Sequence, residues 1–253
     1  MMNRRAARRR RVWYGKAINK LLCGEALPPH FHYTTKTMQE TQFRVCIIDS
    51  PSPHDLMLDR SPARALFELL NHLQIASHYS VAFDKTRFKS VLSSFIRTSS
   101  PTENVIVHIN AHGNQNGFAL TRSFPDNNLP IDVLNNPVDH SQFIQWQELS
   151  TLMAGLQEQT SWAGLALSSC KGAGIAQVAS IMPVDYIIGC LDDIQTYDVA
   201  TAFSYLYRSI QKGNIHSVIP VLSGISGNCF AALHGKGRVR TNILDELLKL
   251  TGG

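Results

Sequence analysis

The 253-residue chain has few cysteines and no long apolar run, and each shortage argues against a class of protein. The five cysteines, at positions 23, 46, 170, 190 and 229, include no close pair. Their spacing gives neither a disulfide framework nor a zinc ribbon, so we expect a reducing, cytoplasmic compartment. No run approaches the roughly 18 apolar residues of a membrane-spanning helix. We therefore expect no transmembrane segment.

Two common catalytic motifs are also missing. His108 and His112 have the spacing of a helical zinc site, but no Glu follows His108, and on a strand four residues span about 13 Å. The glycine-rich segment from Lys171 to Gly174 lacks the spacing of a phosphate-binding P-loop. We expect a structural role for His108, and no metal or organic cofactor.

Acidic residues are absent from positions 1–24, which carry eight of the 24 Arg and Lys residues. The rest of the chain has 16 basic residues against 19 acidic ones, so the net charge of +5 belongs to this arm. Three interpretations stay open: a solvated terminus, a mitochondrial-type presequence, or a tail that contacts an anionic partner such as nucleic acid or a membrane surface. We expect residues 1–42 to form a basic arm and linker, and residues 43–253 to form one domain.

Strand-like and helix-like segments alternate after position 42. Strands are expected at 43–49, 79–83, 104–111, 118–121, 165–167, 186–190 and 228–234. Helices are expected at 62–73, 86–96, 146–156, 172–181, 197–211, 215–222 and 242–250. This alternation predicts an α/β protein, a three-layer α/β/α sandwich around about six mostly parallel strands.

Two of these strands end in a reactive residue close to a glycine. One strand ends before His112-Gly113, and the other ends before Ser169-Cys170. In a parallel sheet both ends would lie at the crevice formed by the carboxyl ends of the strands. An imidazole beside a thiol raises its thiolate fraction and later protonates the leaving group, so we expect His112 and Cys170 to be a catalytic pair. The backbone N–H groups of Gly113 and Cys170 could then hold an oxyanion. A buried, inert cysteine is the alternative for Cys170.

This pattern resembles the caspase-type cysteine peptidases, and within them the bacterial CHAT group more than the animal caspases. The caspase His lies about 50 residues before the Cys, and here the separation is 58 positions (170 − 112). The sequence Ser168-Ser169-Cys170-Lys171-Gly172 departs from the caspase signature Gln-Ala-Cys-x-Gly. The resemblance covers roughly residues 43–233. It implies a caspase-like fold and a His/Cys endopeptidase that cleaves a protein substrate. It also implies an effector of bacterial defence or regulated cell death, switched on by a small molecule or a partner protein.

Substrate preference stays open at the level of the sequence. Arg60 resembles the pocket arginine of caspases, which would favour an acidic residue before the scissile bond. Asp49, Asp192 and Asp193 are candidates for binding a basic one, although Asp192 and Asp193 could instead cap the following helix. Ser168 stands where metacaspase-like and paracaspase-like enzymes place an Asp, which weakens the basic alternative. An apolar preference is the third alternative.

Two rival functions belong to other classes of protein. The first is a non-catalytic caspase-like module that binds an anionic ligand or a partner. The second is a small-molecule cysteine hydrolase on a flavodoxin-like sheet. Cleavage of peptides, and its dependence on Cys170, separates the peptidase from both.

Overall fold

The computed structural model describes residues 42–125, 137, 139–191, 193, 196–212 and 230–236. The basic arm at 1–24, Asp192 and the helices expected at 215–222 and 242–250 lie outside these residues. Among the residues within them, no helix has the length and apolar character needed to cross a membrane.

The strands form a mixed sheet that is mostly parallel. They are β1 (Arg44–Ser50), β2 (Ala76–Val81), β3 (Asn104–Asn114), β4 (Gly117–Ala119), β5 (Phe143–Gln145), β6 (Trp162–Ser168), β7 (Tyr186–Cys190) and β8 (Phe230–His234). The main path runs β2-β1-β3-β6-β7-β8, and within it only β8 is antiparallel to its neighbour. The expected α/β fold is confirmed. The sheet has eight strands, because β3 continues into an antiparallel hairpin with β4, which also pairs with β5.

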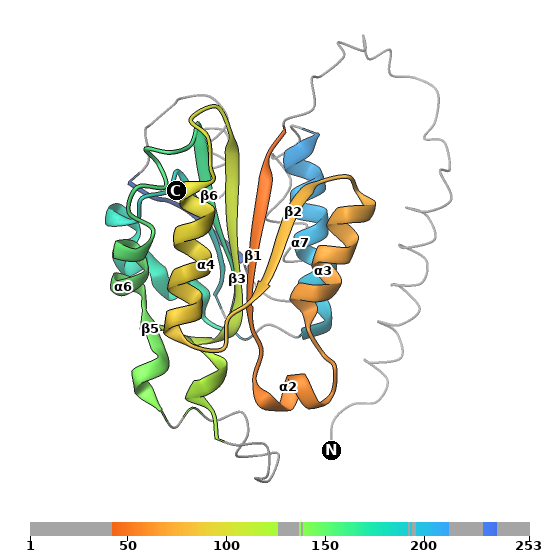
Figure 1. Cartoon of the computed structure of the whole chain (residues 1–253), viewed down its shortest axis with the longest axis vertical. Helices are drawn as coiled ribbons and strands as arrows, with labels where there is room; N and C mark the ends of the chain where they lie inside the picture. Colours follow the sequence, from red (N-terminus) through yellow and green to blue (C-terminus); the bar gives the residue numbers. More distant parts are fainter. Residues whose placement is uncertain are drawn as a thin grey trace. The chain divides into compact units, whose positions relative to one another are not determined.

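Helices cover both faces of this sheet (Figure 1). The α-helices are α2 (Pro53–Met57), α3 (Pro62–His72), α4 (Lys85–Arg97), α6 (Trp146–Leu152) and α7 (Thr196–Gln211). Short 3₁₀ helices lie at η1 (Thr121–Ser123), η2 (His140–Gln142) and η3 (Gly172–Ile181). Helices α4 and α6 lie on one side of the strands, and α3 and α7 lie on the other.

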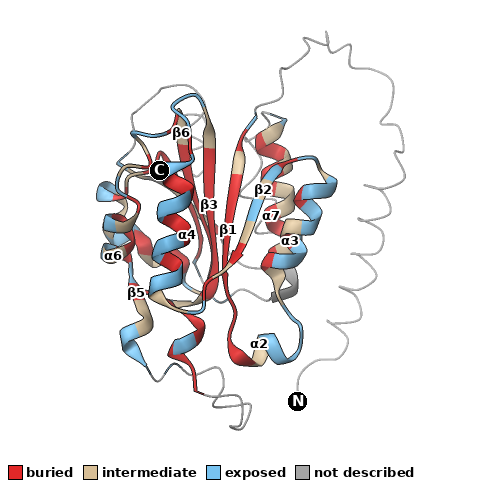
Figure 2. Cartoon of the chain, viewed as in Figure 1, coloured by how far each residue is buried: buried red, intermediate tan, exposed pale blue. Residues whose placement is uncertain are grey.

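The alternation of side chains along the central strands explains this arrangement. In β3, Val105, Val107 and Ile109 belong to the core cluster that includes α4 and α6, whereas Ile106 belongs to the cluster that includes α3 and α7. Both faces of the strand are therefore buried, as the red central strands in Figure 2 show. A continuous apolar run is the pattern expected for a parallel strand covered by helices on both faces.

Short polar residues start the helices as the sequence suggests. Ser61 accepts a hydrogen bond from the Arg64 N–H at 3.0 Å, and Pro62 occupies the first turn of α3. Asp84 caps α4 in the same way. Helix α2 was not expected, because its five residues are too few to show helical periodicity.

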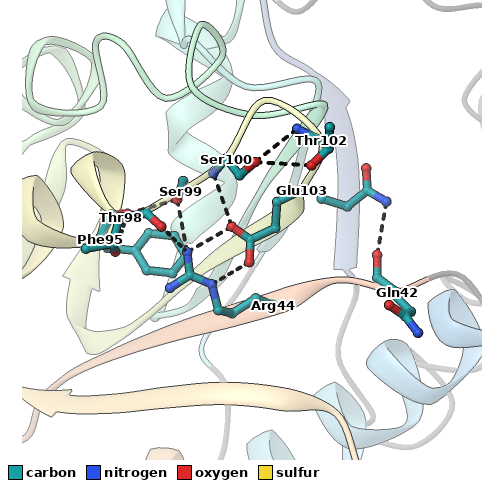
Figure 3. A network of polar contacts seen from close by, with 9 residues as sticks. Gln42, Arg44, Phe95, Thr98, Ser99, Ser100, Thr102 and Glu103 are labelled. Carbon is teal, nitrogen blue, oxygen red and sulfur yellow. Dashed lines mark hydrogen bonds and ion pairs between the residues drawn. The ribbon is translucent and has the colours of Figure 1, made fainter.

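An ion pair fastens the amino-terminal end of β1 to the start of β3 (Figure 3). The Arg44 guanidinium donates from Nε and Nη2 to the two carboxylate oxygens of Glu103, at 2.8 and 2.9 Å. It also contacts the Phe95 ring, 4.5 Å from the ring centre, and Ser99 at the end of α4. Both charged side chains are about one-quarter exposed. Two-pronged geometry and partial burial make this pair stronger than an ordinary surface pair.

Replacing Glu103 by Gln is expected to lower the free energy of unfolding by about 1 to 2 kcal/mol, because the charge and one acceptor are lost. Urea unfolding would show a lower midpoint with an unchanged slope. The matched control is Glu68→Gln, which removes an exposed pair with Arg64 at 3.6 Å and should change the stability by less than about 0.5 kcal/mol. Equal effects of the two substitutions would contradict this account of the Arg44 contact.

Candidate active site

A cleft opens at the carboxyl ends of β1, β3 and β6. Its empty space, part of which is open solvent, measures about 440 Å³, and it is lined by Ser50, Pro51, Asp55, Arg60, Pro62, Asn110, Ala111, His112, Ser168, Cys170 and Val199. The chain builds β2 on one side of β1 and β3 on the other, so the direction of strand addition reverses between β1 and β3. Ligand crevices of open α/β sheets form at such a reversal. His112 and Cys170, 58 positions apart in the sequence, thus share one cleft.

The His112 ring is held in place by an acidic residue and an aromatic ring. Its Nε2 lies 3.0 Å from Oδ2 of Asp55. The Phe124 ring meets it edge to face, with 5.4 Å between ring centres. The strand pairing of His112 with Ala119 fixes the backbone at this position. The side chain is 40% exposed, so the imidazole can exchange protons with a ligand in the cleft.

Asp55 is positioned by the start of α2. Ser52 and Asp55 form a reciprocal capping box, and the Ser52 hydroxyl and N–H donate to Asp55 Oδ2 at 2.7 and 3.3 Å. Partial burial raises the pKa of Asp55, but hydrogen bonds from His112 and Ser52 and the nearby His112 charge outweigh it, so the net pKa is lowered. The carboxylate therefore stays ionised and can stabilise a protonated His112.

The ends of β3 and β6 are in direct contact. A Cβ placed on Gly113 would lie 2.9 Å from the Ser169 Cβ and 3.0 Å from the Cys170 carbonyl oxygen. Only glycine allows this approach, because real Cβ atoms do not come so close to other heavy atoms. The half-buried Cys170 is therefore brought beside the His112-Gly113 segment by backbone packing.

The segment after Cys170 differs from the helix expected at 172–181. It is the 3₁₀ helix η3, which begins two residues after Cys170, and Lys171 precedes it in the left-handed region with φ of 54°. Gly174 allows η3 to lie close to Gln115, since a Cβ there would lie 2.3 Å from the carbonyl oxygen of Gln115. The helix that follows Cys170 is therefore not an α-helix whose positive end could stabilise a Cys170 thiolate.

Arg60 also lines the cleft. It is exposed, and its backbone N–H donates to the carbonyl oxygen of Asp55 at 2.8 Å. Within the described part of the chain its guanidinium makes no ion pair. The group is therefore available to a ligand.

The three candidate aspartates fall in different places. Asp49 is fully buried and does not line the cleft. Its oxygens accept hydrogen bonds from Ser61 at 2.5 Å, Tyr79 at 2.8 Å and Asn110 at 2.8 Å. Asp193 is exposed and is not a lining residue, and Asp192 lies outside the described residues. Direct contact between Asp49 and a substrate is thus blocked by its own hydrogen-bond donors.

A buried chain of polar groups runs beneath the cleft. Nδ1 of His108 lies 2.6 Å from the Tyr207 hydroxyl, and its Nε2 lies 2.8 Å from Oγ of Ser168. Ser168 in turn donates to Oδ1 of Asn110 at 2.9 Å. Complete burial lowers the pKa of His108 to about 3, so the ring is neutral. The structural role expected for His108 is thus the one its contacts support.

Burial has the opposite effect on Asp49. It raises the pKa of this carboxyl group, while hydrogen bonds from Ser61, Asn110 and Tyr79 lower it, and the net pKa is raised. Taking a carboxylate out of water disfavours its charge, and the three donors recover part of that loss. The donors all point at its oxygens, which suits the charged form.

The sequence did not indicate Asp55 or Asn110 as residues of the cleft. It also did not show that Ser168 contacts His108 and Asn110. The tetrapeptide Ser52-Pro-His-Asp55 is a capping-box pattern next to a strand end, and it could have marked the start of α2. Nothing in the sequence shows that the capping carboxylate also faces His112, because 57 positions separate the two residues. Within the described ranges, no cluster of three or more His, Cys, Asp and Glu residues is placed to hold a metal ion.

Comparison with known proteins adds no relative. No protein-family model matches the chain, and no curated protein matches it.

His108 gives the protein a predictable response to acid. Its folded-state pKa of about 3 lies below the ordinary value of 6.5, so the unfolded chain binds a proton that the folded chain does not. This residue's contribution to stability is complete above about pH 6.5 and is lost as the pH falls toward 3, by roughly 1.4 kcal/mol per pH unit. Urea unfolding between pH 4 and 7 would measure the slope.

The variant His108→Gln is the control for that measurement. Its amide can donate to Ser168 and accept from Tyr207 but does not titrate. The slope of the free energy of unfolding against pH, between pH 4 and 6.5, should therefore be smaller by roughly 1.4 kcal/mol per pH unit, the contribution of one proton. Identical slopes in both proteins would show that His108 is not held neutral.

Proposed function

We propose that the protein is a caspase-like cysteine endopeptidase with the catalytic pair His112 and Cys170. The observation that carries the proposal is that both residues line one cleft, with the imidazole bound at 3.0 Å by Asp55. A nucleophile, a base and a group that orients the base are the three parts of nucleophilic peptide cleavage. The sheet is covered by α4 and α6 on one face and by α3 and α7 on the other, and this arrangement supports a three-layer caspase-like architecture.

In the proposed reaction, Sγ of Cys170 attacks the carbonyl carbon of the peptide bond while His112 takes the thiol proton. The backbone N–H groups of Gly113 and Cys170 hold the negative oxygen of the tetrahedral intermediate. His112 then gives its proton to the departing amine, leaving an acyl-enzyme. Water attacks the thioester with His112 as base, and the carboxylic acid and the Cys170 thiol are released. Asp55 stabilises the imidazolium that forms in both steps.

The substrate class that suits this cleft is a polypeptide. The cleft lies at the carboxyl ends of central strands, and the exposed Arg60 is among its lining residues, which suits contact with an extended chain. The family resemblance extends the proposal to an effector in bacterial defence or regulated cell death, activated by a small molecule or a partner protein. An anionic partner of the basic arm is a candidate for that signal.

Cleavage of a mixed peptide library by the wild type and by Cys170→Ala tests the proposal. The wild type should cut the library, with lysate of the native host supplied where an activator is needed, and Cys170→Ala should reduce the rate by at least about 1000-fold. Identical product patterns from the two proteins under both conditions would favour the non-catalytic binding module.

The contribution of Asp55 is tested separately by Asp55→Asn. The substitution keeps the shape of the side chain but removes the charge facing His112, so kcat should fall roughly 100-fold with little change in KM. Asp59→Asn is the matched control, because Asp59 is 93% exposed in the same segment and asparagine tolerates its φ of 49°. Equal activities of Asp55→Asn and the control would remove Asp55 from the mechanism.

A further inference from the structure

The floor of the cleft is built from one row of side chains across three strands. Asp49 in β1, Asn110 in β3 and Ser168 in β6 are direct cross-strand partners. Asn110 and Ser168 line the cleft although they are only 6% and 4% exposed, and Asp49 lies behind Asn110. Buried polar groups at the base of a pocket fix which ligand groups it accepts.

The hydrogen atoms in this row can be assigned from their partners. Ser168 has one hydroxyl hydrogen and two possible acceptors, and Oδ1 of Asn110 at 2.9 Å is nearer than the carbonyl oxygen of Ile109 at 3.3 Å. Nε2 of His108 must therefore carry the hydrogen that it shares with Ser168, and Nδ1 accepts from Tyr207. Asp49 holds the Asn110 amide in the orientation with its nitrogen toward the carboxylate. No member of the row can rotate without losing a hydrogen bond.

With the hydrogens assigned in this way, some hydrogen-bond donors and acceptors of Asn110 and Ser168 remain for a ligand. Asn110 has two amide hydrogens, and one of them goes to Asp49. Its carbonyl oxygen and the Ser168 oxygen each keep one acceptor lone pair after their contacts are counted. The floor thus presents one donor and two acceptor positions.

We propose that Asn110 and Ser168 form the pocket for the side chain before the scissile bond and select a carboxamide, that of asparagine or glutamine. This inference rests on the proposed peptidase function. A carboxamide supplies an oxygen for the Asn110 N–H and hydrogens for the acceptor positions, and its oxygen can also accept from Arg60.

Charged side chains fit the floor less well. A carboxylate can pair with Arg60, but it has no donor for the two acceptor positions of the floor and would lie above the buried carboxyl group of Asp49. A lysine or arginine side chain leaves the Asn110 donor without an acceptor and adds a second positive charge near Arg60. Sites that hydrogen-bond a specific group discriminate strongly against analogues that lack it.

Isosteric peptide pairs test the inference on the full-length wild-type protein. Peptides with identical flanks would carry Asn, Asp, Gln, Glu, Lys or Leu before the cleaved bond. The better carboxamide peptide should have a kcat/KM at least tenfold above that of its carboxylate isostere and of the Lys peptide. The highest kcat/KM with Asp, Glu, Lys or Leu would overturn the inference while leaving the peptidase intact.

The variant Asn110→Ala shows whether this residue makes the selection. It should bring the kcat/KM values of the carboxamide and carboxylate peptides within about threefold of each other, and this ratio is the readout, whatever the variant does to the overall rate. An undiminished carboxamide preference in a folded variant would overturn the role of Asn110. Thermal unfolding reports whether the variant is folded, and where it is not, the isosteric pairs on the wild type decide.

A binding measurement separates failure of this inference from failure of the peptidase. The same peptides would be added to Cys170→Ala protein, and the melting temperature followed, since a ligand that binds the folded state raises it. A rise with Asn or Gln peptides, without cleavage by the wild type, would retain the pocket and reject the peptidase. No rise with any peptide and no cleavage would reject both.

Discussion

The packing of the end of β3 against the end of β6 is the constraint on which the rest of the site depends. Gly113 allows the two backbones to approach until Ser169 and Cys170 touch the His112-Gly113 segment. A side chain at position 113 would have to displace Cys170 or tilt β3. The sheet therefore sets the relative positions of the two reactive residues, and the loops around the cleft do not have to do so.

Polar groups beneath and beside the cleft complete the site. The capping box of α2 orients Asp55, which in turn orients His112, while the buried row from His108 to Asp49 fixes the floor. Buried polar groups are costly unless each finds a partner. The partners come from β1, β2, β3, β6 and α7 and from Ser61, so folding of the domain and assembly of the cleft are coupled.

Sequence reasoning predicted the alternation of strands and helices because apolar runs and capping residues are local signals. Strand β7 was predicted to the residue. The approach of Gly174 in η3 to Gln115 was not predicted, since it is a contact between distant segments. Asp55 and Asn110 were missed for the same reason, and burial removes Asp49 from direct substrate contact. The residues at strand ends could be predicted from the sequence. Their contact partners could not, because those partners are brought close only by the fold.

The central claim is that His112 activates Cys170, and the rate of Cys170 alkylation by iodoacetamide tests it without a substrate. Cys46 and Cys190 are buried, and burial raises the pKa of the Cys46 thiol to about 12, so these two should react slowly and serve as internal references. Mass spectrometry would follow the modification of each cysteine at pH 7. The account predicts that His112→Ala slows alkylation of Cys170 at least tenfold relative to the wild type. Equal rates in the two proteins would contradict it.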